Sequence, residues 1–231
     1  MLTRLIIVSV FLATALPPAV HAADAPSTQP AIIVDKEKKT ITVPCKVAPR
    51  QLEHLVKQGY TEIYPIEVVA TLPAPKGQKA HETVLTFNVV PSDVHKALES
   101  LGLKPGKPAY GEGPAATGPE VKIYLELPTP DGSTQRIPLE KSLVDKKTGK
   151  TMPTVKWLFT GSAMRKPDPT KDELAYGADL SGTLIGIFPI TNETVIQTNL
   201  RAGDEKLLKM ETNKKLLPPE GTPLNLIIEV K

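Results

Sequence analysis

Two histidines and a glutamate lie close together in the segment KAHETVLTFNVVPSDVHKALESLG, residues 79–102. Histidine and glutamate can bind a metal ion together or act as an acid–base pair. A zinc-protease helix, however, needs a His-Glu-x-x-His pattern, and no second histidine follows His81 at that spacing. HETVLTFNVV is instead typical of a strand, in which neighbouring side chains point to opposite faces. We therefore expect no metal site, and we expect His81 and Glu82 to diverge unless the strand begins after them.

Other catalytic motifs are missing from the sequence. FTGSAM lacks the Gly-x-Ser-x-Gly elbow of serine hydrolases, and no histidine follows it in the chain. The glycine-rich stretch GEGPAATG contains a proline and leads into no capped helix, which argues against a phosphate-binding loop. We therefore assign no catalytic residue and expect no cofactor.

Three carboxylates occupy positions that hydrophobic periodicity does not explain: Glu67, Glu82 and Asp179. Buried carboxylates are costly unless they are paired, so each either caps a turn, which is the simpler explanation, or lines a shared cleft. If a binding site exists, we expect it at a lip formed by His81, Glu82 and Asp179, with Trp157 as a further candidate. Trp157 alternates with apolar neighbours, which also suits a core position.

Short alternating runs between frequent prolines, 24 among 231 residues, are typical of a β-rich protein. EVKIYLEL and RIPL, separated by a turn, predict a hairpin. Apolar residues at helical spacing predict a helix that starts with Ser92 as its N-cap and ends at Gly102, and a second short helix is expected within residues 49–59. The expected fold is α+β: a mostly antiparallel β-sheet with one or two short helices packed on a face.

The N-terminus has the pattern of a secretory signal peptide over residues 1–22: one arginine, an apolar run cut short by two prolines, and small residues before a cleavage site. A short disordered lead is expected over residues 23–30 and a single domain over residues 31–231. No later stretch is apolar enough to span a membrane. These features predict a periplasmic or secreted protein without a transmembrane segment after signal cleavage.

Charge and cysteine content exclude further classes. The chain has 28 basic and 25 acidic residues, few aromatics and no basic stripe, so we expect no nucleic-acid partner. A single cysteine excludes an intrachain disulfide. Cys45 shares the parity of apolar neighbours in TITVPCKV, which predicts a thiol packed in the core.

Several segments in the same order resemble the YdjY-domain family of exported bacterial proteins, whose function is unestablished. These segments are YPIEVVATLPAPKGQKAHETVL, VVPSDVHKALESLGLKPGKP, VKWLFTGS, AYGADLSGTLIGIF and LPPEGTPLNLIIEV. The matching positions are Glu67, His81, Glu82, Ala97, Leu98, Gly102, Trp157, Gly161, Ser162, Asp179 and Gly182. The resemblance implies compartment and fold more than activity. Some relatives carry ferredoxin-like cysteine clusters, but one cysteine cannot hold an iron–sulfur cluster.

The leading expectation is an exported, non-enzymatic binding or accessory module whose partner is an envelope or extracellular protein or a small ligand. The first alternative is a metal-dependent or acid–base hydrolase that uses His81 with Glu82 or Asp179. The second alternative is a structural envelope protein, which would have no pocket and would expose an apolar patch or an unprotected strand edge.

Overall fold

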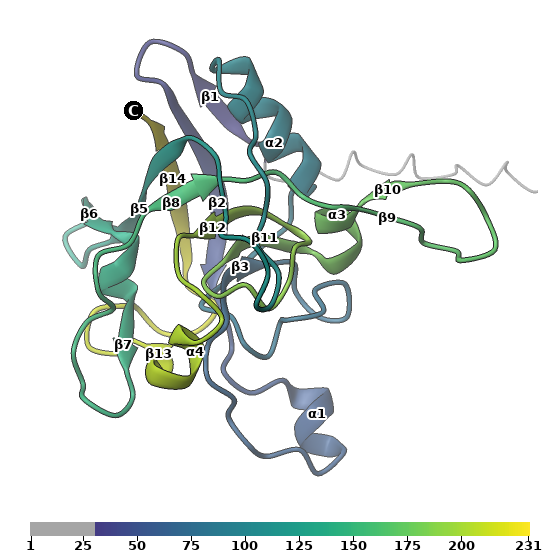
Figure 1. Ribbon diagram of the computed structural model, residues 1–231. Helices are drawn as coiled ribbons and strands as arrows, with labels where there is room; N and C mark the ends of the chain where they lie inside the picture. The colour runs from purple at the N-terminus through teal and green to yellow at the C-terminus, as the bar shows by residue number, and fades with distance from the viewer. Residues whose placement is uncertain (1–30) are drawn as a thin grey trace, which may run out of the picture.

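The computed structural model describes residues 31–231 (Figure 1). The predicted signal peptide and lead therefore lie outside the described residues. The strands are β1 (Ile33–Asp35), β2 (Thr40–Val47), β3 (Val68–Thr71), β4 (Leu85–Phe87), β5 (Glu120–Pro128), β6 (Thr134–Pro138), β7 (Leu143–Asp145), β8 (Trp157–Phe159), β9 (Met164–Arg165), β10 (Ala175–Tyr176), β11 (Thr183–Gly186), β12 (Thr194–Thr198), β13 (Met210–Thr212) and β14 (Pro223–Val230). The helices are α1 (Glu53–Lys57), α2 (Pro91–Ser100), α3 (Gly177–Ser181), α4 (Asp204–Leu207) and the 3-10 turn η1 (Leu139–Ser142).

Eight of these strands close into a barrel. The hydrogen-bonded order β2-β14-β5-β8-β12-β11-β3-β4 returns to β2, because β2 also pairs with β4. All pairings in the ring are antiparallel except β11 with β12 and β3 with β4, which are parallel. Strand β1 pairs with β2 outside the ring, and β6 pairs with β5. Closure satisfies the backbone groups that an open sheet would leave at its two edges.

The expected α+β fold, with helices packed on one face of a sheet, is therefore wrong. The fold is mostly β, and only α2 lays a substantial apolar face on the barrel, through Pro91, Val94, Ala97 and Leu98. Closure leaves no mark on the pattern of apolar residues, because a strand in a barrel shows the same alternation as a strand in an open sheet. What decides closure is the pairing of β2 with β4 across about forty residues of chain, and alternation carries no information about that partner.

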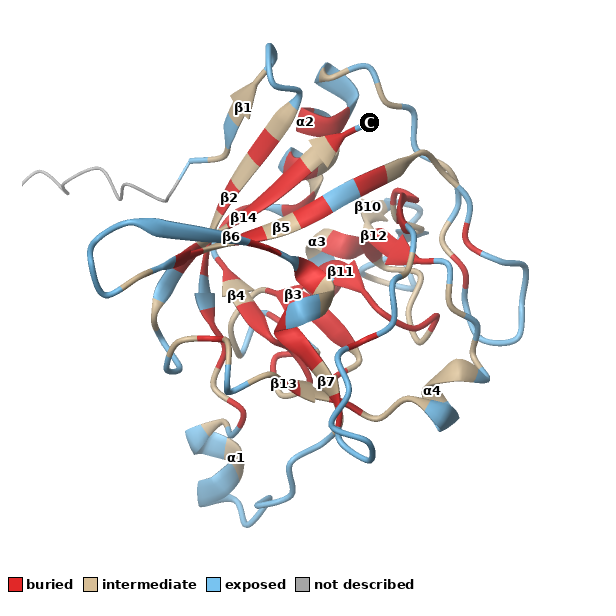
Figure 2. Cartoon of the chain, turned by 90° about the vertical axis from the view of Figure 1, so that its left-hand side faces the viewer, coloured by how far each residue is buried: buried red, intermediate tan, exposed pale blue. Residues whose placement is uncertain are grey.

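The long strands show why the barrel has a continuous core. Side chains of β5 alternate strictly between buried and more exposed, as the stripes in Figure 2 show. Its inward residues lie beside those of the neighbouring strand β14. The core also contains large side chains that are fully buried, among them Phe87, Phe159 and Phe188. The predicted hairpin is confirmed as β5 and β6, paired from Tyr124 opposite Pro138 to Pro128 opposite Thr134.

Cys45 is buried in β2, as its parity predicted. Burial raises the pKa of its thiol to about 12, since an apolar surrounding disfavours the thiolate. The thiol donates a weak hydrogen bond to the Val43 carbonyl. A protonated, buried thiol is a packing group and not a nucleophile.

The predicted helix is present as α2, but its start differs from the prediction. It begins at Pro91, one residue before Ser92, and the flanking Val90 provides no side-chain cap. The backbone N–H of Ser92 donates to the Asp179 carboxylate at 2.8 Å, so a residue from α3 satisfies this end of the helix. The capping group comes from a residue 87 positions away in the sequence, so no local pattern around Ser92 could have predicted it.

The second predicted helix is confirmed as α1, but it does not pack on the barrel. It lies in a lobe, residues 51–64, which extends away from the barrel at the bottom of Figure 1. None of the α1 residues is buried, in contrast to α2. A hydrogen bond from the Gln51 side chain to the Thr61 carbonyl, 3.1 Å, ties the two ends of the lobe together.

Candidate functional site

The segment that carries His81 and Glu82 is a loop. Strand β4 begins only at Leu85, and a turn closes with the N–H of Glu82 donating to the Lys79 carbonyl at 3.0 Å. His81 Nε2 consequently lies 3.3 Å from Glu82 Oε1. The strand therefore begins after these two residues, which is the case in which divergence is not expected: alternation holds within a strand, and because this part of the chain turns before β4 starts, the two side chains meet.

Lys79 joins two carboxylates at this loop. Its Nζ lies 2.8 Å from Glu67 Oε2 and 2.7 Å from Glu82 Oε2. Burial raises the pKa of Glu67, and the neighbouring Glu82 adds to this rise. Burial opposes the charge on Lys79, but the two carboxylates outweigh it and raise the pKa of that ammonium. All three side chains are at least two-thirds buried.

The ammonium of Lys79 stands between two carboxylates, a position that a bound cation could otherwise fill. Among residues 31–231, no group of three or more histidine, cysteine or acidic side chains is arranged to hold a metal ion. The geometry therefore gives the carboxylates Glu67 and Glu82 an internal cation as their partner. His81, which lies beside this cluster, can act there as a hydrogen-bonding group.

Arg50 is the buried centre of this region, and its side chain is 3% exposed. Its Nε donates to Glu211 Oε1 at 2.7 Å, and its two terminal nitrogens donate to the backbone carbonyls of His81 and Tyr64. Burial alone would raise the pKa of Glu211, but the hydrogen bonds from Arg50 and from the Thr212 N–H, together with the nearby positive charges, outweigh it and lower that pKa. One guanidinium thus fixes the loop that carries His81 to the end of the lobe that carries Tyr64.

A pocket of about 430 Å³ lies between the lobe and this loop. We call it the lobe pocket, and it is lined by Leu52, His54, Leu55, Tyr60, Tyr64, Ala74, Pro75, Gly77, Gln78 and His81. The imidazole of His81 meets the ring of Tyr64 edge-on, with 5.8 Å between the ring centroids. The lining combines apolar and aromatic surface with two imidazoles and two phenols, a mixture typical of small-ligand sites.

The pKa of His81 is lowered from 6.5, first by burial and then by the charge of Lys79. We expect its imidazole to titrate below 6.5 in an NMR pH titration. Because the unfolded chain then binds this proton more readily than the folded chain, stability should fall as the pH drops through 6.5 toward the lowered pKa. His81→Gln should remove this part of the acid sensitivity in urea unfolding. A titration midpoint above 6.5 would contradict the prediction.

The other two predicted site residues lie elsewhere. The carboxylate of Asp179 holds the start of α2 through Ser92. Trp157 is 2% exposed, and its indole N–H donates to Glu140 Oε1 at 2.8 Å, so it packs in the core as its alternation suggested. The structure therefore brings together His81 and Glu82 of the four candidates. His95, the remaining histidine of the opening segment, lies 2.7 Å from the Tyr176 hydroxyl and serves packing at the edge of the core.

Sequence reasoning missed Arg50, Lys79 and the two tyrosines of the lobe. Arg50 lies in a short polar linker that carries no motif, and its partners are far away in the chain. Tyr60 and Tyr64 gave a weak signal, since two of only five tyrosines lie four positions apart. Lys79 sits three residues before Glu82 and could have been paired with it had the segment been recognised as a turn.

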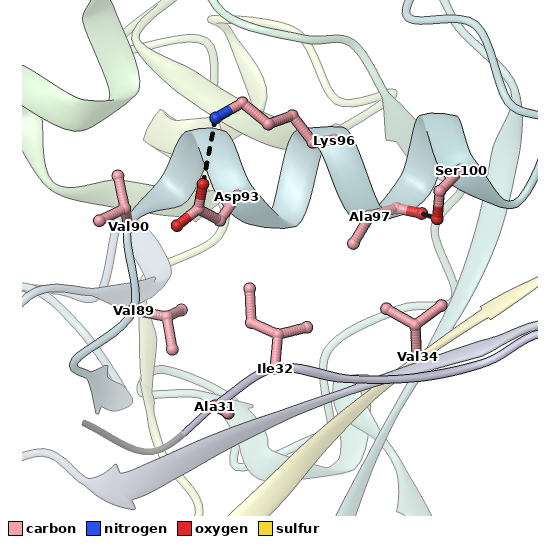
Figure 3. A pocket seen from close by; sticks show the side chains of 9 residues that line it. All are labelled: Ala31, Ile32, Val34, Val89, Val90, Asp93, Lys96, Ala97 and Ser100. Atoms are coloured by element: carbon pink, nitrogen blue, oxygen red, sulfur yellow. Dashed lines mark hydrogen bonds and ion pairs between the residues drawn. The ribbon is translucent and has the colours of Figure 1, made fainter. Parts of the chain in front are cut away.

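A second groove, of about 480 Å³, separates α2 from β1 (Figure 3). Its walls are mainly apolar. The carboxylate of Asp93 pairs with the ammonium of Lys96 at 3.2 Å, and the Ser100 hydroxyl donates to the Ala97 carbonyl at 2.7 Å. The polar side chains drawn in Figure 3 are thus already partnered within their own helix. None of them is left unpaired to bind a polar group of a ligand in this groove.

The sequence of this chain can be compared with protein-family models, with curated proteins and with solved structures. A protein-family model described as the YdjY domain matches residues 32–229. No curated protein matches the chain, and no solved structure matches it. Across residues 31–231, no helix combines the length and the apolar character that crossing a bilayer requires.

Proposed function

We propose that this chain, which belongs to the YdjY-domain family, is a binding module that holds a ligand with an aromatic or aliphatic body in the lobe pocket. The observation that carries the proposal is the pocket itself, where Tyr60, Tyr64 and His81 converge beside apolar side chains. Among the described residues that line it, none is a serine, threonine, cysteine or lysine that could act as a nucleophile.

The exposed surface around the pocket supports a partner of the same character. Val56, Tyr60, Ile63 and Tyr64 all remain exposed although they are large and apolar. Single exposed apolar residues are ordinary, but four within nine positions of a protruding lobe form the kind of surface that binds another molecule. The body of such a ligand would pack on the tyrosine rings, and His81 would hydrogen-bond to its polar end.

The test is NMR-detected binding of small aromatic probes, namely indole, phenol and benzyl alcohol, to the protein. We expect shifts of the His81 imidazole signals and a loss of binding in Tyr60→Ala. Tyr110→Ala is the matched control, because Tyr110 is 59% exposed against 60% for Tyr60 and lies outside the pocket. Equal shifts in both variants, or no shift in the unmodified protein, would reject the lobe pocket as the binding site.

A hydrolase remains the second candidate, because one observation favours it. The contact of 3.3 Å between His81 Nε2 and Glu82 Oε1 is that of a carboxylate orienting a histidine base. The lowered pKa of His81 keeps the imidazole neutral at pH 7, as a base requires. Turnover of chromogenic ester and amide substrates that is abolished by His81→Gln would favour this candidate over the binding module.

Export is part of the proposal and rests on the signal-peptide pattern of residues 1–22. Its test is the N-terminal sequence of the protein recovered after expression with its own leader. We expect the mature chain to begin at Ala23, in the periplasmic or secreted fraction. An intact Met1 in the cytoplasmic fraction would remove export from the proposal. A purely structural role is less well supported, since barrel closure leaves few strand edges and a pocket lies between the lobe and the loop that carries His81.

A further inference from the structure

The largest pocket described for this chain lies on another part of the barrel and shares no residue with the lobe pocket. It measures about 890 Å³. We call it the strap pocket, since the small sheet of β7 and β13 borders it. It is lined by Pro138, Glu140, Lys141, Val144, Gly149, Thr151, Met152, Thr154, Thr212, Asn213, Lys214, Lys215 and Leu216.

Hydrogen bonds between the two borders hold the strap pocket in shape. Strands β7 and β13 pair from Leu143 opposite Thr212 to Asp145 opposite Met210. Asn213 fastens the next residues, because its N–H donates to the Ser142 carbonyl and its side-chain amide donates to the Lys141 carbonyl, both at 2.8 Å. The pocket is therefore a preformed feature of the fold, which reduces the ordering that binding would require.

The charge of the strap pocket is positive, and among its lysines Lys214 also acts on the Glu211 carboxylate, whose pKa its charge helps to lower. Lys141, Lys214 and Lys215 line it, and in the described part of the chain no carboxylate lies within 4.0 Å of their ammonium groups. The acidic side chain in the lining is Glu140, one of whose oxygens already accepts the indole N–H of Trp157 at 2.8 Å. Three ammonium groups against one engaged carboxylate favour an anionic group in the pocket.

One buried hydroxyl in the wall lacks a partner. Thr212 is 7% exposed, and its Oγ1 has no hydrogen bond to any described residue. A buried hydroxyl without a partner is costly, so polar groups in such walls are normally satisfied. Apolar surface from Pro138, Val144, Met152 and Leu216 makes up much of the remaining lining.

We propose that the strap pocket binds an amphiphilic anion, whose carboxylate or phosphate head is held by Lys141, Lys214 and Lys215. Its apolar body lies against Val144 and Met152. The positive rim supplies attraction for the head, and the apolar wall supplies the larger area removed from water on binding. This site is separate from the lobe pocket and does not depend on what binds there.

The test is isothermal titration of the full chain with dodecyl phosphate below its micelle concentration. The variant Lys141→Gln, Lys214→Gln, Lys215→Gln should weaken binding at least tenfold, and added salt should weaken binding to the unmodified protein. The matched control is Lys36→Gln, Lys104→Gln, Lys122→Gln, which removes the same charge from three exposed lysines outside the pocket and outside the ion pairs. Its affinity should equal that of the unmodified protein.

Two further probes separate the sources of the anion. Inorganic phosphate should bind at least tenfold more weakly than dodecyl phosphate, because it lacks the apolar body. Sedimentation with phosphatidylglycerol vesicles, but not with phosphatidylcholine vesicles, would assign the head group to a membrane lipid, and its absence would assign it to a soluble amphiphile. Equal affinity of the two triple variants, or no heat of binding with dodecyl phosphate, would overturn the proposal.

Thr212→Val tests the wall independently of charge. If the unpartnered hydroxyl meets the bound head group, this variant should bind dodecyl phosphate several-fold more weakly. In the free protein it should leave the urea midpoint unchanged or raise it, since the replaced hydroxyl makes no hydrogen bond. A lowered midpoint together with unchanged affinity would remove Thr212 from the site.

Discussion

Replacing Arg50 with methionine is expected to lower the free energy of unfolding by about 3–5 kcal/mol, the usual cost of removing one partner from a buried ion pair. The Arg50 side chain is 3% exposed, and its guanidinium donates to Glu211 and to the backbone carbonyls of His81 and Tyr64. Methionine fills part of the volume but leaves the partly buried Glu211 carboxylate without its cation and two carbonyls without their donor. Urea unfolding followed by circular dichroism measures the loss.

A surface ion pair provides the control for Arg50. The Nε of Arg165 lies 2.7 Å from Glu193 Oε1, the same distance as in the Arg50 pair, but its side chain is 44% exposed. Arg165→Met should change the free energy of unfolding by at most about 1 kcal/mol. We also expect Arg50→Met to broaden or shift the His81 signals, because the His81 carbonyl loses its donor. Equal stabilities of the two variants would show that the buried pair does not hold the lobe pocket together.

Replacing Gly77 with alanine is expected to have the second largest effect, about 3 kcal/mol of lost stability through forced backbone movement. A Cβ at this position would lie 1.8 Å from the carbonyl oxygen of Leu72 and 2.8 Å from the Thr71 hydroxyl. The Leu72 carbonyl belongs to the backbone, and the Thr71 hydroxyl is buried and held by its hydrogen bond to the Gly182 carbonyl, so neither can move aside easily. The loop that carries Lys79 and His81 must therefore shift away from the barrel. Urea unfolding and the His81 NMR signals measure the two consequences.

The matched control is Gly203→Ala. A Cβ at Gly203 meets no heavy atom within 4 Å, and its φ of −64° suits any residue. Its free energy of unfolding should stay within about 0.5 kcal/mol of the unmodified protein. If Gly77→Ala were as stable as Gly203→Ala, with unchanged His81 signals, the close approach of the loop to β3 would be excluded as the reason for glycine there.

The two expected losses arise from one arrangement. Gly77 allows the loop to lie close against β3, and Arg50 then ties the same loop to the lobe through the carbonyls of His81 and Tyr64. Both residues fix the position of the backbone around the lobe pocket. The geometry of this pocket therefore depends on them as well as on the side chains that line it. Variants of Tyr60, by contrast, should alter binding without unfolding the chain, since that side chain is 60% exposed.

The sequence by itself determined the local features. Alternation located the hairpin of β5 and β6 and the buried position of Cys45, helical spacing located α1 and α2, and proline frequency indicated a β-rich chain. These features depend on a few neighbouring residues, so a pattern can report them. The order of segments also identified the family, which the match over residues 32–229 confirms.

Only the tertiary structure decided the closure of the barrel and the composition of the lobe pocket. Closure depends on β2 pairing with β4, and the pocket depends on Arg50 bonding to Glu211, 161 positions further along the chain. His81 and Glu82 meet because the chain turns before β4, and the sequence alone left open whether the strand begins before or after them. Contacts of this kind join residues that no local period relates, and their free energy comes from burial that exists only once the whole chain has folded.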